Sequence, residues 1–265
     1  MTPGQGVSQK LPAVNWRNFG ICCIFAKDSH VSTVLITGKG ETTLFPERIT
    51  DFLVHLQPYN FPFLELQNNG IVFLQKRKKY QKYLKEWYNL GLTTMALSIV
   101  HYDQKIGKMI YQPDGSYFDL AELIPYLHSF GYSVRLSCMM FKGGIDSIEG
   151  VKKIIRYAKD NHAEQLTVRS IGMPENSENK KVAKWVSEHK LAKDRVQEIK
   201  RFLDKEGKKL MPLAHGAMVY DYKGQNICLS NCLTLKPSSE EIRQLIFFPD
   251  GHLRYDWRYP GAILL

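Results

Sequence analysis

Two short stretches of the sequence carry residue types that can do chemistry. The adjacent thiols of Cys22 and Cys23 are potential metal ligands, and the turn Thr-Gly-Lys-Gly-Glu at residues 37–41 ends in a carboxylate. Glycines let the backbone approach a ligand closely, and a carboxylate accepts hydrogen bonds from an ammonium group or a hydroxyl. The same turn is also typical of a tight strand-to-helix connection, so by itself it predicts no particular ligand.

Polar residues recur near the ends of the other predicted strands. Asn69 ends one strand and Ser98 lies late in the next, while Arg135 and Ser137 lie in a further strand and Arg169 in the last. In parallel α/β folds, ligands bind at the carboxyl ends of the strands. Polar groups at several consecutive strand ends therefore predict the mouth of a ligand site.

The two arginines have a second interpretation. Arg135 and Arg169 lie in strands that are otherwise apolar, and a buried charge needs a partner. Each arginine can face an anionic ligand, or can form a structural ion pair with Glu65 or Glu41. The sequence leaves both alternatives open.

An alternation of strands and amphipathic helices must position these residues. Segments with apolar residues at helical spacing separate six predicted strands, which cover residues 13–17, 32–38, 63–70, 93–100, 132–141 and 164–172. Such an alternation is typical of parallel βαβ units. The sequence therefore predicts an α/β fold in which the six strands form an open or partial (βα)6 barrel.

The chain divides into three parts on this interpretation. Residues 1–12 form a flexible lead, residues 13–208 form the barrel with a helical extension, and residues 209–265 form a small C-terminal β-rich appendage. Within the appendage, Lys223-Gly224 and Asp250-Gly251 are expected to be the turns of two hairpins, because such pairs favour the tight turns that join antiparallel strands.

Charge and hydropathy limit the kinds of partner. The net charge of +10 suits an anionic partner, such as nucleic acid, a nucleotide-like cofactor or an acidic surface. A soluble basic protein with a solvated surface explains the same charge, and the sequence leaves both alternatives open. In the densest basic run, residues 75–87, the aromatic residues share one helical face and are expected in the core, so nucleic-acid contact is not favoured. No apolar run reaches about 18 residues and no signal peptide is recognisable, so we expect a cytoplasmic protein without a membrane partner.

The order of these motifs resembles the radical S-adenosylmethionine (radical SAM) superfamily, over about residues 14–174. Members of that family fold as a partial (βα)6 barrel. Their second strand ends in a Gly-Gly-Glu-Pro-like turn that receives the amino group of the methionine moiety. The stretch "LQNNG" at residues 66–70 is similar to the end of the family's third strand. The residues that match the glycine turn are Gly38, Lys39, Gly40 and Glu41, followed by Thr42 where proline is usual.

The resemblance implies a cofactor and a chemistry. The family cleaves S-adenosylmethionine reductively at a [4Fe–4S] cluster, and the resulting 5′-deoxyadenosyl radical abstracts hydrogen from a substrate, so an active member needs an electron donor. The substrate is not identified by the sequence. By resemblance, the methionine end would lie at Gly38, Gly40 and Glu41, the ribose or carboxylate at Ser98, Arg135 and Ser137, and the adenine beside residues 169–172.

The cysteines depart from the family's pattern. The family holds its cluster with three cysteines spaced C-x3-C-x2-C in a loop after the first strand, so that each thiolate reaches a different iron. Here the segment after Arg17 is too short for that loop, and only Cys22 and Cys23 remain. The two thiols can be ordinary buried residues, or can form a four-thiolate site with Cys228 and Cys232.

Two functional hypotheses follow from this departure. The first is an enzyme of the radical SAM type, whose cluster ligands come from elsewhere. The second is a non-catalytic relative, which binds S-adenosylmethionine or a partner protein but lacks the cluster.

Overall fold

Eight strands form one sheet in the computed structural model of the chain, which describes residues 11–38, 40–172, 179–213, 217–230, 242, 244–256 and 261–265. The strand order is β1-β2-β3-β4-β5-β8-β7-β6. The first five strands pair in parallel and in sequence order. They are β1 (Thr33–Ile36), β2 (Phe63–Asn68), β3 (Leu92–Ile99), β4 (Ser133–Met140) and β5 (Gln165–Ser170). The α/β fold and five of the six predicted strands are therefore confirmed.

The prediction of a first strand at residues 13–17 is wrong. Trp16 begins a helix, α1 (Trp16–Asp28), and the side chain of Asn15 caps it by accepting a hydrogen bond from the Asn18 backbone N–H (3.0 Å). The buried residues Phe19, Cys22 and Cys23 stand three and four positions apart, which is the spacing of one helical face. The partly buried Trp16 and Ala26 extend this face in both directions along α1. The helical face therefore outweighs the short apolar run at its start.

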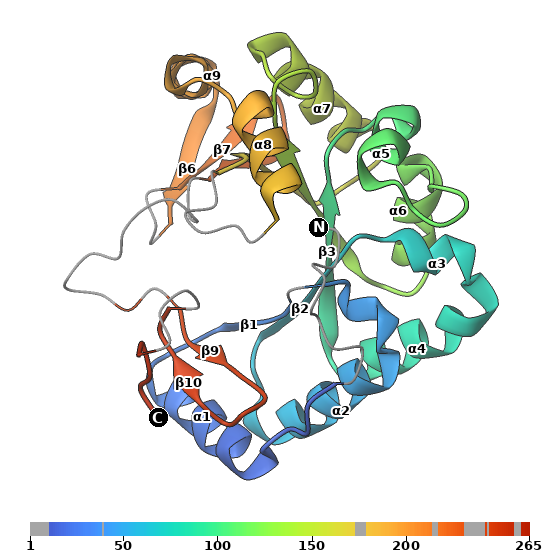
Figure 1. Cartoon of the computed structure of the whole chain (residues 1–265), viewed down its shortest axis with the longest axis vertical. Helices are drawn as coiled ribbons and strands as arrows, with labels where there is room; N and C mark the ends of the chain where they lie inside the picture. Colours follow the sequence, from blue (N-terminus) through green and yellow to red (C-terminus); the bar gives the residue numbers. More distant parts are fainter. Residues whose placement is uncertain are drawn as a thin grey trace.

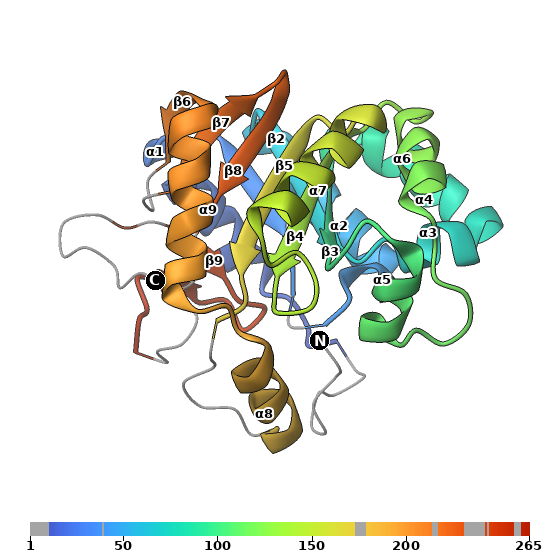
Figure 2. The same cartoon turned by 90° about the horizontal axis from the view of Figure 1, so that it is seen from above.

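A strand from late in the chain lies beside β5. β8 (Gln225–Leu229) pairs with β5 in parallel, and β7 (Met218–Tyr222) and β6 (Lys208–Pro212) continue the sheet in antiparallel pairs. Figure 2 shows β8 near both β5 and β7. The predicted hairpin at Lys223-Gly224 is confirmed, and both residues have a positive φ (54° and 82°), as a tight two-residue hairpin turn requires.

The second predicted hairpin is also confirmed, and it packs on α1. β9 (Ile246–Phe247) and β10 (Leu253–Arg254) form an antiparallel pair around Asp250-Gly251. The Phe247 ring contacts the Phe19 ring of α1 edge-on (centroids 5.0 Å apart), and the Asn15 backbone N–H donates to the Pro249 carbonyl (3.2 Å). The end of the chain thus covers the start of α1.

Figure 1 shows helices α2 to α7 along the outer side of the curved sheet. Alternation along β4 separates the two faces: Val134, Leu136 and Cys138 are fully buried, whereas Arg135 and Ser137 are half-exposed on the opposite, inner face. No helix in the described ranges is long and apolar enough to cross a membrane. The helices after α1 are α2 (Pro46–Leu56), α3 (Ile71–Gln75), α4 (Arg77–Asn89), α5 (Gln104–Tyr111), α6 (Leu120–His128), α7 (Ile148–Asp160), α8 (Lys180–His189) and α9 (Lys193–Glu206).

One carboxylate joins α9 to the far end of the sheet. Asp204 contacts Lys200 one helical turn earlier (2.7 Å) and Lys209 of β6 (2.9 Å), and it accepts a hydrogen bond from the Tyr220 hydroxyl of β7 (2.9 Å). The hydrogen bond from Lys200 and then that from Lys209 hold the pKa of Asp204 well below its usual range. The contacts therefore favour the ionised form of Asp204 in the folded protein.

We expect Asp204→Asn to lower the free energy of unfolding by about 1 kcal/mol at pH 7, because charge-assisted hydrogen bonds at a partly exposed site are worth about this much. A depressed pKa contributes stability above the unfolded-state value, and this contribution is lost as the pH falls through the folded-state value. The difference between the two proteins in urea unfolding should therefore shrink below about pH 4. Asp160→Asn, at an exposed position on α7, is the control, and an equal effect there would contradict the assignment.

Candidate functional site

The carboxyl ends of β1 to β5 lie side by side, and the predicted mouth is at this edge. Because the strands are parallel, inner-face residues of neighbouring strands lie next to one another. Ser98 pairs with Ser137, and Met139 pairs with Arg169. All four side chains are half-exposed. The fold therefore brings Ser98, Ser137 and Arg169 onto one continuous surface.

A residue that the sequence analysis missed links this surface to the turn after β1. Gln67 of β2 donates from Nε2 to Ser98 Oγ (3.2 Å), and its Oε1 accepts from the Thr37 hydroxyl (3.4 Å). Its backbone carbonyl accepts from the Thr42 hydroxyl (2.8 Å). Along β2, the buried Leu64 and Leu66 alternate with the half-exposed Glu65 and Gln67. This period-two pattern is visible in the sequence and places Gln67 on the inner face.

Glu41 is held by two neighbouring loops. It caps the 3₁₀ helix η1 (Thr42–Leu44), where its Oε1 accepts from the backbone N–H (2.9 Å) and the hydroxyl of Thr43. Its Oε2 accepts from the backbone N–H of Asn69 (2.8 Å). Burial raises the pKa of Glu41, although these hydrogen bonds act in the opposite direction. Glu41 therefore ties the turn after β1 to the turn after β2.

The turn after β2 is shaped by its own side chains. Asn68 Oδ1 accepts from the Gly70 backbone N–H (2.8 Å), and Asn69 Oδ1 accepts from the Ile71 N–H (3.0 Å). Gly70 has a φ of 75°, and a Cβ there would lie 2.7 Å from a side-chain atom of α6. Residue 70 is therefore glycine for both backbone and packing reasons, and the resulting turn points the Asn69 N–H at Glu41.

Arg135 forms the structural ion pair that the sequence left as an alternative. Its Nη2 lies 2.6 Å from Glu65 Oε2, and its Nη1 donates to Oε1 (3.3 Å). The two side chains are only 25% and 13% exposed, and they reach from β4 and β2 across β3 on the inner face. Arg135 lies two residues before Ser137 on β4. The ion pair is therefore one inner-face position farther from the carboxyl ends of the strands than Ser137.

Arg169 reaches back over β4. Its Nε lies 3.0 Å from Met139 Sδ, and the two residues are direct neighbours in the sheet. A thioether is a weak acceptor, so this contact orients the guanidinium without neutralising it. Arg169 therefore lies at the outermost step of the row, nearest the carboxyl ends of the strands.

The glycines of the turn after β1 face open space. A Cβ at Gly40 would meet no atom within 4 Å, and at Gly38 the nearest atom would be Thr42 Cγ2 at 3.6 Å. Packing therefore does not require glycine at either position. Lys39 lies outside the described residues.

The cysteines that the structure describes are not arranged as cluster ligands. Cys22 and Cys23 lie in α1 and are 4% and 5% exposed. Burial raises the pKa of both thiols, to about 12 for Cys23, where the neighbouring Cys22 adds to the effect. Cys228 is buried on β8, and Cys232 lies outside the described residues. Within the part of the chain that the structure describes, no three His, Cys, Asp or Glu side chains are grouped to hold a metal ion.

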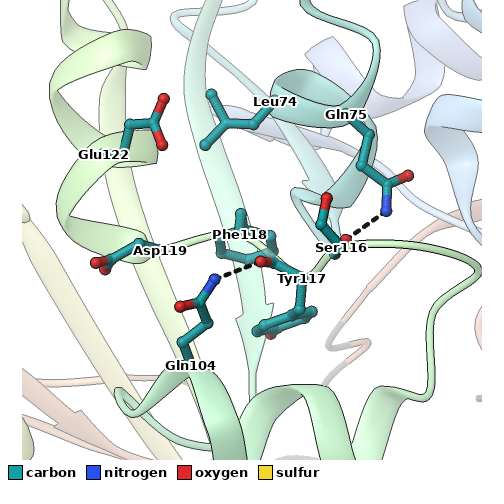
Figure 3. Close-up of a pocket in the computed structure, with 8 residues that line it drawn as sticks. All are labelled: Leu74, Gln75, Gln104, Ser116, Tyr117, Phe118, Asp119 and Glu122. Carbon is teal, nitrogen blue, oxygen red and sulfur yellow. Dashed lines mark hydrogen bonds between the residues drawn. The ribbon is translucent and has the colours of Figure 1, made fainter.

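A pocket of about 450 Å³ lies apart from the predicted site residues, between α3, α5 and the start of α6 (Figure 3). Gln75 donates to the carbonyl of Ser116, and Gln104 donates to that of Tyr117. Both amides therefore hold the loop before α6, and Asp119 caps that helix by accepting from the Ala121 N–H (2.9 Å). The residues that line the pocket are Leu74, Gln75, Gln104, Ser116, Tyr117, Phe118, Asp119 and Glu122.

Solved structures that share this α/β fold include SuiB from Streptococcus suis. With SuiB bound to S-adenosylmethionine, the TM-score is 0.58 at 13% identity, over 97% of this chain and 56% of the SuiB chain. With SuiB bound to its precursor peptide SuiA, the TM-score is 0.53 at 14% identity, over 94% and 53% of the two chains. No protein-family model matches the chain, and no curated protein matches it by sequence.

The likeness to SuiB concerns the fold. The chain spans about half the length of the SuiB chains that it matches.

We expect Glu41→Gln to lower the free energy of unfolding by about 1–3 kcal/mol, with no ligand present. Both carboxylate oxygens of Glu41 accept hydrogen bonds, from Thr43 and from the Asn69 backbone N–H. A glutamine in its place has only one oxygen and must point its NH2 group at the N–H of Thr43 or of Asn69, so at least one hydrogen bond is lost. Urea unfolding at pH 7 measures the change. Glu86→Gln makes the same substitution at an exposed position and should shift stability by less than about 0.5 kcal/mol. Equal stability of Glu41→Gln and wild type would contradict the linking role.

Proposed function

We propose that the inner face of the sheet, at the carboxyl ends of β2 to β5, binds S-adenosylmethionine. The observation that carries the proposal is the row of half-exposed polar side chains from Gln67 through Ser98 and Ser137 to Arg169. Closed barrels fill their interior with branched apolar residues, whereas this face offers hydroxyl, amide and guanidinium groups. Such groups suit a ligand with ribose hydroxyls, a carboxylate and an ammonium group.

Comparison with SuiB supports the same ligand. SuiB shares the fold and binds S-adenosylmethionine, and it also binds a precursor peptide. We extend the first of these ligands to this chain because the polar row lies where parallel α/β folds bind ligands. The peptide complex makes a peptide the first substrate class to test alongside S-adenosylmethionine.

Each predicted residue takes a role within this proposal. The open turn with Gly38 and Gly40 lets the backbone receive the methionine end, and Glu41 acts as a positioning residue that holds this turn. Ser98 and Ser137 meet the ribose or carboxylate, and Arg169 flanks the adenine. Lys39 keeps its place in the predicted set, and Asn69 contributes through its backbone N–H to Glu41. Arg135, paired with Glu65, forms the floor beneath these groups.

The described residues do not fit a [4Fe–4S] cluster. Adjacent residues on a helix point about 100° apart, and the thiols of Cys22 and Cys23 are buried and kept protonated by that burial. Cluster ligands need thiolates that reach different irons. Of the two functional hypotheses, we therefore propose the second, a relative that binds S-adenosylmethionine without a cluster.

Ser137→Val should weaken S-adenosylmethionine binding about tenfold, because it removes a hydroxyl from the centre of the row and adds bulk there. Isothermal titration calorimetry on the purified chain measures the affinity. Thr94→Val is the matched control, since Thr94 lies on the inner face of β3 but near its amino end. Equal losses in both variants, or no binding by wild type at millimolar ligand, would overturn the proposed site.

Anaerobic reconstitution with iron and sulfide tests the other hypothesis. We expect no more iron to be retained than by a Cys22→Ala/Cys23→Ala variant, and no paramagnetic signal after reduction. A cluster that forms in wild type and is lost in the double variant would support the first hypothesis, an enzyme of the radical SAM type. Because the titration with S-adenosylmethionine needs no cluster, the two experiments fail independently.

A further inference from the structure

A dense basic surface on α4 is not used by the mouth. Six cationic side chains lie at the start and along the exposed side of this helix, and all six are exposed. We call this set the α4 basic surface. Its members are Lys76, Arg77, Lys78, Lys79, Lys82 and Lys85.

Most of this charge is not neutralised within the described part of the protein. Arg77 lies 3.6 Å from Glu122, and its guanidinium lies 4.2 Å from the centre of the Tyr126 ring. The five lysines form no ion pair with any residue in the described ranges. Five like charges within ten residues repel one another, so an anion that binds them gains both attraction and relief of that repulsion.

The helix that carries these charges is firmly anchored. Tyr80 and Trp87 are at most 2% exposed. The Tyr80 hydroxyl donates to the Thr43 carbonyl (2.6 Å), and Trp87 Nε1 donates to the Thr50 hydroxyl (2.9 Å). The lysines therefore stand on a rigid base, and the aromatic rings of α4 that could stack on nucleic-acid bases lie mostly in the core.

Carboxylates border the α4 basic surface. Glu47 of α2 accepts a hydrogen bond from the Tyr83 hydroxyl, which lowers the pKa of Glu47, as do the charges of Lys79 and Lys82. Glu122 of α6 lies at the Arg77 end, and Glu86 lies on α4 itself, next to Lys85. An extended phosphate backbone that crosses the helix would pass these carboxylates.

We propose that the α4 basic surface docks an acidic segment of a partner protein. The three lysines Lys78, Lys82 and Lys85 are spaced four and three residues apart, so they form one row about 10 Å long. Glutamates at the same spacing on a partner helix match this row. Lysines supply point charges without the bidentate geometry of arginine, so the contact depends on charge density and weakens with salt.

Fluorescence anisotropy with a labelled peptide of ten glutamates tests the proposal. We expect binding at low ionic strength, and at least a tenfold loss of affinity when Lys78, Lys82 and Lys85 are all changed to Glu. The corresponding Lys→Gln triple variant should lose less, because it removes charge without reversing it. The control is Lys181→Glu/Lys193→Glu/Lys205→Glu, which changes the net charge equally at exposed positions on α8 and α9 and should keep the affinity within about threefold.

A ten-nucleotide single-stranded RNA is the competing probe. The proposal requires it to bind more weakly than the glutamate peptide. Tighter RNA binding that the Lys78/Lys82/Lys85 variants abolish would make this surface a nucleic-acid site instead. An equal loss of peptide binding in the control variant would reduce the effect to net charge and would overturn the proposal, as would no peptide binding by wild type.

Discussion

The parallel strands have helices α2 to α7 on one face. The rest of the structure depends on which partners the polar side chains of the other, inner face find for their hydrogen bonds and charges. Parallel sheets are normally apolar on both faces, because helices bury both. Here β4 alternates between buried Leu136 and Cys138 and half-exposed Arg135 and Ser137. The inner face therefore needs polar partners, and it finds them within itself, through the Arg135–Glu65 ion pair and the Gln67–Ser98 hydrogen bond.

These internal contacts divide the inner face into two parts. The floor is the Arg135–Glu65 ion pair, and the rim is the set of residues nearer the carboxyl ends of the strands, with Ser137 and Arg169. The Arg135–Glu65 pair satisfies both charges locally, so it stabilises the floor more than it attracts a ligand. Toward the carboxyl ends, Ser137 and Arg169 are half-exposed, Arg169 contacts the thioether of Met139, and the glycine turn after β1 leaves open space at Gly40. Glu41 holds this rim together, because one carboxylate accepts hydrogen bonds from the loops after β1 and β2. The local stability of this rim therefore depends on Glu41, and so would the binding of the proposed ligand.

The two charged features of the molecule have different physical characters. On the inner face, charge is paired at short range and partly shielded from solvent, so it responds little to salt. On α4, the lysines are exposed and form no ion pair with the described residues, so their field extends into solvent and is screened by salt. The first arrangement suits a small ligand held by direct hydrogen bonds, and the second suits long-range attraction of an acidic surface.

The sequence by itself determined most of the strand–helix alternation and both hairpins, because period-two and helical spacings act locally and Lys223-Gly224 and Asp250-Gly251 favour tight turns. The binding roles of the residues at the strand ends stay a prediction. It misjudged residues 13–17, where the helical face of Phe19, Cys22 and Cys23 starts earlier than the local pattern indicated. Only the tertiary structure decided that Arg135 pairs with Glu65, that Gln67 joins Thr37 to Ser98, and that β8 lies beside β5. Each of these contacts joins residues about 30 to 70 positions apart, and the strand order that brings such residues together is a property of the whole chain.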